Sequence, residues 1–229
     1  METFTYKEIL QQPSCWVKEY EVLLEEKARI QAFLEKYLTN ETDIVLIGAG
    51  TSAFIGDAIA PLLCGVWKNV RAVATTDIVT NAADYLVADK PLLLISFARS
   101  GNSPESVAAV NLANAICKNV AHIYITCNKN GHLAKSANAE NILSLLLPEE
   151  TDDKSLAMTS SFSTMLLTCL MISQIDHIEA ERERIEAVAA NAQAILSDYA
   201  GAIEAIAARP FERGVFLGSG PMKGIAEEC

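Results

Sequence analysis

The sequence predicts an α/β protein in which a parallel sheet is covered by helices on both faces. Short patterns typical of buried strands alternate with longer helical patterns, and this alternation produces right-handed βαβ units. The apolar runs, such as 44–47 and 92–95, are continuous, as expected for strands that are buried on both faces. With 229 residues, of which 51% are hydrophobic, the chain is long enough for a sizeable core.

The elements follow in order. Residues 1–12 are expected to be loosely ordered, and 13–38 to form an amphipathic helix in one or two pieces, because apolar residues recur there at helical spacing. Strands are then expected at 44–47, 70–74, 92–97, 122–127 and 142–147, and helices at 53–63, 78–87, 104–118, 159–176 and 178–208.

The opening pattern returns near the end of the chain. Residues 214–220, GVFLGSG, repeat the plan of residues 44–50, IVLIGAG, and a helical pattern follows both. A sheet does not end on its first strand, so we expect the chain to be a fragment that contains only the start of a second, similar domain. The predicted organisation is a helical segment (1–40), a first α/β domain (41–176), a connecting helix (177–212) and the opening of the second domain (213–229).

Composition limits the classes of function. The net charge of −11 argues against a nucleic-acid-binding surface. Six cysteines without a CxxC pair, several of them inside apolar runs, predict reduced, buried thiols. No signal peptide is recognisable, and the longest apolar run, 165–172, is too short to span a bilayer. We therefore expect a soluble cytoplasmic protein that binds neither nucleic acid nor membrane.

The most informative segment is 92–106, LLLISFARSGNSPES, in which a buried strand leads through a serine-rich turn into a helix that begins at Pro104. A helix N-terminus offers unpaired N–H groups and partial positive charge, so such a turn suits a phosphate. The alternative is that Ser103 merely caps the helix. Two further turns, 48–52 (GAGTS) and 157–161 (AMTSS), have the same character. The hydroxyl donors of the three turns are Thr51, Ser52, Ser100, Ser103 and Thr159.

A dinucleotide site is a second interpretation of the first turn. GAGTSA fits the pattern G-x-G-x-x-A, and Asp77 follows the next strand, where an acid that binds ribose would lie. This interpretation leaves the serine-rich second turn without a role.

Together the GAGTS, SGNSPES and TSSFSTMLL segments resemble the sugar isomerase (SIS) domain, over about residues 40–176. Within it the chain most resembles the tagatose-6-phosphate ketose/aldose isomerase family, linked to amino-sugar catabolism. The resemblance implies a three-layer α/β/α sandwich with a flavodoxin-like parallel sheet, a sugar phosphate ligand and no cofactor. It implies that Ser52, Ser100 and Ser103 hold the phosphate, assisted by Thr51, Arg99 and Gly101, with Thr159 substituting for a family serine whose position falls on Met158. Where the related glucosamine-6-phosphate synthase has Ser-Gln-Ser, this chain has Ala98-Arg99-Ser100. It therefore loses one hydroxyl and gains a cation, which could bind phosphate or face solvent.

Aldose–ketose isomerisation needs a base that moves a proton between C1 and C2. Glu228 matches a family glutamate, although it could equally be a solvated helix acid. We expect His122 to be structural, His132 to lie at the rim or on the surface, and His177 to be a surface or packing residue. No metal-ligand spacing is present in the sequence.

Two functions therefore remain open. The first is an isomerase, or a deaminating isomerase that converts galactosamine 6-phosphate to tagatose 6-phosphate. The second is a phosphosugar sensor, as in transcriptional regulators that contain SIS domains, but residues 1–40 show no basic recognition helix. The apolar surface of the first helix and of the helix after Thr159 predicts a homodimer or larger assembly.

Overall fold

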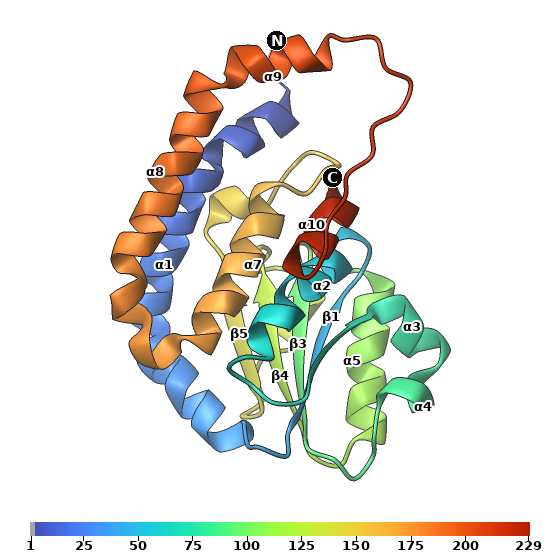
Figure 1. Cartoon of the computed structure of the whole chain (residues 1–229). Coiled ribbons are helices and arrows are strands. Elements are labelled where there is room, and N and C mark those ends of the chain that lie inside the picture. Colours follow the sequence, from blue (N-terminus) through green and yellow to red (C-terminus); the bar gives the residue numbers. More distant parts are fainter. Residues whose placement is uncertain (1–2) are drawn as a thin grey trace.

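The structure, a computed structural model, describes residues 3–229 (Figure 1). Its centre is a parallel five-stranded sheet with the strand order β2-β1-β3-β4-β5. This is the flavodoxin-like order of doubly wound α/β proteins, so the predicted fold class is confirmed. The strands are β1 (Asp43–Gly48), β2 (Val70–Ala74), β3 (Leu92–Ala98), β4 (Val120–Thr126) and β5 (Ile142–Leu146).

Helices cover both faces of the sheet, and successive strand residues alternate between two apolar cores. Ile44 and Leu46 of β1 pack into one core with α1, α2 and α7, whereas Val45 and Ile47 pack into the other with α3 and α5. The longer helices are α1 (Phe4–Tyr37), α2 (Thr51–Leu63), α5 (Pro104–Ile116), α7 (Ser160–Ser173) and α8 (Arg182–Asp198). The shorter ones are α3 (Thr75–Thr80), α4 (Ala82–Tyr85), α6 (His132–Lys135), α9 (Ala200–Ala207), α10 (Pro221–Glu228), and the 3-10 turns η1 (Glu149–Thr151) and η2 (Ile175–Glu181).

The start of α1 corrects the expectation that residues 1–12 are loosely ordered. The helix begins at Phe4. Its N-cap residue is Thr3, whose hydroxyl accepts a hydrogen bond from the Tyr6 N–H at 3.2 Å. Pro13 lies inside the helix rather than at its start. Glu8 in the second turn is buried against distant parts of the chain, and this packing stabilises turns whose own apolar content is low. Residues 1–2 lie outside the described part of the chain.

Three other expectations were wrong in detail. The helix predicted at 78–87 is two short helices, α3 and α4, because Asn81 between them has non-helical angles (φ −140°, ψ 59°). The helix predicted at 178–208 is divided into η2, α8 and α9. The repeated apolar segment Val215, Phe216 and Leu217 forms no strand with any other part of residues 3–229, and these side chains are 80%, 61% and 90% exposed. A strand needs a neighbouring strand for its backbone hydrogen bonds, and this segment has none there.

The end of the chain packs back against α2, the helix that follows β1. In Figure 1, α8 rises beside α1, α9 crosses the top of the molecule, and residues 208–220 arch back so that α10 packs on α2. The contact is close at Gly224, where a Cβ atom would overlap the Phe54 carbonyl and lie 2.5 Å from the Ala58 nitrogen. The turns before the two helices have the same backbone: Gly50 has φ 56° and ψ −131°, and Gly220 has φ 56° and ψ −132°. The repeat seen in the sequence is therefore also a repeat of local structure.

Two observations bear on the composition-based expectations. No helix within residues 3–229 is both long and apolar enough to cross a membrane. All six cysteines are free; four are buried, whereas Cys64 and Cys229 are exposed.

Candidate functional site

A cleft of about 250 Å³ opens at the carboxyl ends of β1 and β3. It is formed by the first two of the three predicted turns and by the loop that precedes α7. The residues that carry the argument are Gly50 and Ser52 from the first turn, Arg99, Ser100 and Ser103 from the second, and Met158 from the loop. The structure thus brings together four of the predicted site residues: Ser52, Arg99, Ser100 and Ser103.

Ser103 does not cap α5, although it occupies the N-cap position. Its hydroxyl donates to the Ser106 hydroxyl at 2.6 Å, and it makes no hydrogen bond to an N–H of the helix. The N-cap of α2 is Gly50, which has no side chain for capping. Both helix N-termini at the cleft therefore lack a side-chain acceptor, and this arrangement favours an anion from outside the chain.

The second turn is supported from behind by the loop before α6. Gly101 has a positive φ of 64°, a conformation that favours glycine. The Asn128 side chain donates to the Ser100 carbonyl at 3.1 Å, and the His132 N–H donates to the Asn102 side chain at 2.9 Å. Gly101 therefore shapes the turn through its backbone, and His132 lies behind the turn at the exposed rim.

Two hydroxyls of the cleft have weak partners. The buried Ser52 hydroxyl donates to the Met158 sulfur at 3.8 Å, and a thioether is a weak acceptor. The exposed Ser100 hydroxyl accepts the Asn102 N–H at 3.3 Å. Because these bonds are weak or long, both hydroxyls can turn towards a bound oxyanion at little cost.

Within residues 3–229, Arg99 is the one cationic side chain that lines the cleft. Its Nη1 atom donates to the Ser155 carbonyl at 3.1 Å, so the guanidinium is held between β3 and the loop before α7. Its remaining donors are suited to bind a phosphate. The position of Arg99 at the cleft is compatible with the phosphate-binding alternative that the sequence left open.

The third turn differs from the other two, because its helix N-terminus is already occupied. The buried carboxylate of Asp153 accepts the N–H groups of Thr159 and Ser161, both at 2.9 Å, and the Ser161 hydroxyl at 2.6 Å. The Thr159 hydroxyl also faces Asp153, at 3.5 Å. The structure therefore does not bring Thr159 into the cleft, and Met158 lines it instead. Sequence reasoning missed Asp153, although an acid shortly before a run of hydroxyl residues is a possible signal for a capping carboxylate.

Glu228 and Thr51 are brought together although they lie far apart in the sequence. α10 packs on α2, so that the half-buried Glu228 lies beside Thr51 in the first turn of α2. Burial raises the pKa of the Glu228 carboxyl, and the Thr51 side chain opposes part of this shift. A carboxylate with a raised pKa is a better proton acceptor than a fully solvated one.

The other candidates lie away from the cleft. His122 is fully buried on β4, its Nε2 is 2.9 Å from the Asn114 side-chain oxygen, and burial lowers its pKa to about 4. His177 is exposed within η2. Asp77 is exposed in the first turn of α3, and the sheet lacks the strand order 3-2-1-4-5-6 of dinucleotide-binding folds. These observations do not support the dinucleotide interpretation.

A flavodoxin-like sheet with an open, hydroxyl-lined cleft at two helix N-termini defines a class of α/β domains suited to phosphorylated ligands. Residues 37–174, more than half of the chain, match the family model described as the SIS domain. The chain belongs to the SIS domain family.

Similar proteins share more than this domain with the chain. D-galactosamine-6-phosphate deaminase AgaS from Escherichia coli is 46% identical over 230 residues, which cover 99% of this chain and 59% of that protein. The protein of the same name from Shewanella sp. is 42% identical over 99% of this chain and 58% of its own length. The chain thus spans about three fifths of the length of these curated relatives.

Solved structures agree with this similarity. The crystal structure of tagatose-6-phosphate ketose/aldose isomerase from Escherichia coli matches with a TM-score of 0.92 and 46% identity, over 99% of this chain and 62% of that one. The C-terminal domain of glucosamine-fructose-6-phosphate aminotransferase from Francisella tularensis matches with a TM-score of 0.82 at 19% identity, over 100% of this chain and 65% of that one. The second match reflects the fold alone.

Proposed function

We propose that the protein containing this chain is an aldose–ketose isomerase of phosphosugars that deaminates an amino-sugar 6-phosphate. The proposed substrate is galactosamine 6-phosphate and the proposed product is tagatose 6-phosphate. The observation that supports this most is the position of Glu228, whose carboxyl lies beside Thr51, the residue between Gly50 and Ser52 of the cleft. The similarity to proteins named D-galactosamine-6-phosphate deaminase supports the choice of substrate.

The phosphate would bind at the N-termini of α2 and α5. Ser52, Ser100 and Ser103 would donate their hydroxyls, and Arg99 would contribute its charge. Thr51 and the backbone of Gly101 would assist from the edge of the cleft. Fixing the phosphate holds the opposite end of the sugar, C1 and C2, in one place relative to the base. Thr159, which bonds Asp153, has only an indirect part in this arrangement.

The reaction balances with water as the only co-reactant. A base such as Glu228 removes the proton from C2 of the open-chain amino sugar while the C1 carbonyl oxygen gains a proton, which gives an enolamine. A proton is then delivered to C1 as the nitrogen loses one. The product is a C2 imine, which water hydrolyses to the ketose and ammonia. Burial raises the pKa of Glu228, and a carboxylate with a raised pKa is a stronger base for this proton transfer.

The chain would be the first SIS domain of a longer protein, with the proposed boundaries 41–176 for that domain, 177–212 for the connection and 213–229 for the start of the second. The shared backbone of the Gly50 and Gly220 turns supports this division. We also propose that the protein is cytoplasmic. We further propose that it forms a homo-oligomer, because α8 and α9 expose apolar side chains. These are Val188, Ile195, Ile203 and Ile206.

The alternative function is a phosphosugar sensor without catalysis. An assay of ammonia and ketose formation separates the two, using this chain and the longer protein with galactosamine 6-phosphate, glucosamine 6-phosphate and other hexosamine phosphates. We expect the longer protein to release ammonia and ketose in equal amounts, and this chain to bind the substrate with little or no turnover. If the longer protein binds these compounds and converts none of them, it is a sensor.

A further inference from the structure

The second turn of α1 carries a buried carboxylate, Glu8, that has no role in the proposed chemistry. Its side chain is 6% exposed. The carboxylate accepts the Lys154 N–H at 2.5 Å, the Ser155 N–H at 3.2 and 3.3 Å, and the Ser155 hydroxyl. Hydrogen bonds to a buried carboxylate are strong and directional, so Glu8 fixes the backbone of the loop before α7 at these two residues.

Ser155 also contacts Arg99, a residue of the cleft. Its carbonyl oxygen accepts Arg99 Nη1 at 3.1 Å, and Arg99 lines the cleft with Ser100 and Ser103. One residue therefore connects Glu8 to the guanidinium: Glu8 holds Ser155 through its N–H and hydroxyl, and Ser155 holds Arg99 through its carbonyl.

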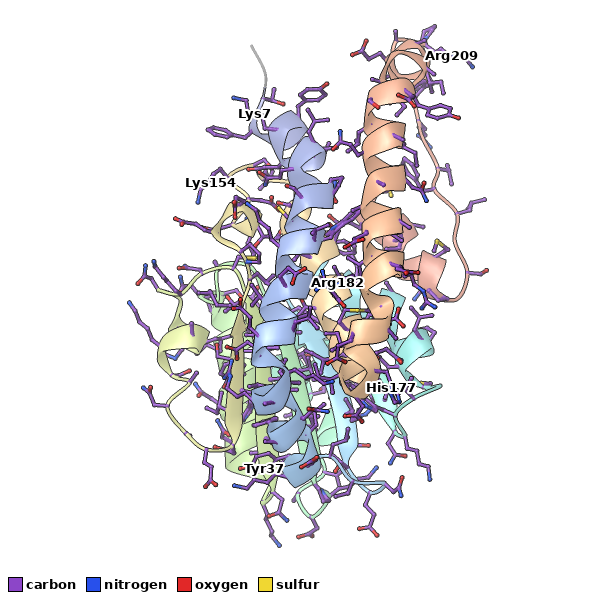
Figure 2. All side chains as sticks on the ribbon, turned by 90° about the vertical axis from the view of Figure 1, so that its left-hand side faces the viewer. Lys7, Tyr37, Lys154, His177, Arg182 and Arg209 are labelled. Carbon is purple, nitrogen blue, oxygen red and sulfur yellow. The ribbon has the colours of Figure 1, made fainter. Side chains whose placement is uncertain are left out.

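Further contacts hold this loop against α1. Gln11 donates to the Glu150 carbonyl at 2.7 Å and to the Ser160 hydroxyl at 2.9 Å, and Lys18 pairs with the Glu150 carboxylate. Figure 2 shows Lys154 beside the upper turns of α1, below Lys7. α1 and the loop thus form one packed unit, in which Glu8 is the residue bonded directly to the position that contacts Arg99.

We propose that Glu8 is a positioning residue for the anion cleft, which acts through Ser155 to hold Arg99 in the orientation that receives the sugar phosphate. This inference rests on the proposed function, since the ligand is that phosphosugar. A free arginine side chain loses rotamer freedom when a ligand orders it, and an arginine that is already held loses less. Glu8 therefore affects the affinity for the phosphate and leaves the proton-transfer steps unchanged.

The test is a double-mutant cycle, read as the Kd of galactosamine 6-phosphate by isothermal titration calorimetry. It compares the wild-type chain, E8Q, R99A and E8Q/R99A. We expect E8Q to raise Kd about tenfold when Arg99 is present and less than about twofold in the R99A background. E25Q, which changes an exposed carboxylate on the same helix, is the matched control and should leave Kd unchanged. Hydrogen exchange of the Lys154 and Ser155 amides should be faster in E8Q. In the longer protein, E8Q should raise KM and leave kcat unchanged.

Several outcomes would overturn the inference. If R99A weakens binding and E8Q does not, Glu8 does not position Arg99, although the proposed function stands. If E8Q weakens binding equally in both backgrounds, Glu8 acts on the fold as a whole. Failure of the wild-type chain to bind the sugar phosphate overturns the proposed function and this inference with it. Should E8Q fail to fold, S155A replaces it in the cycle, because it removes a donor to Glu8 and retains the carbonyl that Arg99 contacts; an unchanged Kd in S155A then overturns the inference.

Discussion

Asp153 is the residue whose replacement we expect to reduce stability most. Its buried carboxylate accepts two backbone N–H groups at the start of α7, both at 2.9 Å, and the hydroxyls of Ser160 and Ser161. Asp153→Ala leaves these donors without an acceptor in a region that is shielded from solvent. Ser160 and Ser161 are themselves fully buried, so water cannot replace the carboxylate without a rearrangement.

The magnitude follows from these contacts. A hydrogen bond to a charged group contributes about 1.5–3 kcal/mol, and a carboxylate at a helix N-terminus contributes about 0.3–1 kcal/mol through the helix dipole. The bonds share one carboxylate and are not additive, and each buried donor that loses its acceptor costs about 1–3 kcal/mol. We therefore expect Asp153→Ala to lower the free energy of unfolding by about 3–5 kcal/mol, and Asp153→Asn, which keeps one acceptor oxygen, by about half of that.

Urea unfolding followed by circular dichroism measures this difference. The control is Asp152→Ala, which removes the neighbouring acid, a partly exposed partner of Lys154 at 2.9 Å. An ion pair of this kind contributes about 0–1 kcal/mol, so the control should unfold close to the wild type. A loss of less than about 1 kcal/mol in Asp153→Ala would refute the view that this carboxylate holds the start of α7.

Three further predictions concern the cleft, the core and the end of the chain. Ser100→Ala and Ser103→Ala should each weaken binding of a hexosamine 6-phosphate by about 1–3 kcal/mol; equal thermal stabilisation of mutant and wild type by the ligand would contradict the site. Burial raises the pKa of Glu19 from 4.5 to about 8, so the unfolded chain ionises first and stability should fall as the pH rises from 4.5 to 8. Glu19→Gln should remove that slope in urea titrations at several pH values, and an unchanged slope would exclude Glu19 as its source. Gly224→Ala should separate α10 from α2, because a Cβ atom has no room at this position. Limited proteolysis would detect the separation as faster cleavage within residues 208–229 than in the wild type.

The strands and the two open turns could be predicted because their signals are local. Continuous apolar runs predict strands that are covered on both faces, and β2 has the predicted bounds, Val70–Ala74. A strand followed by glycine, serine and proline predicts the turn before α5. The resemblance to a known family added the ligand class, which local patterns cannot specify.

The remaining features depend on contacts between distant residues. The first turns of α1 are helical because Glu8 packs against a loop more than 140 positions away. Asp153 occupies the third helix N-terminus from six positions before Thr159, whereas an N-capping side chain normally belongs to the residue directly before the helix. The segment around Phe216 has the local pattern of a strand, but a strand also needs a neighbour, and this requirement is not visible in a short window of sequence.

The packing of α10 on α2 also has a consequence for the order of folding. The helices are joined by a chain of well over one hundred residues, and closing so long a loop carries a large entropic cost before any contact compensates it. Contacts of high sequence separation form slowly, and during synthesis the N-terminal part of a chain leaves the ribosome first. The anion cleft can therefore assemble around β1 and β3 while α10 is still being synthesised. Glu228 would join a cleft that is already formed, so its carboxyl is the last part of the candidate site to reach its place.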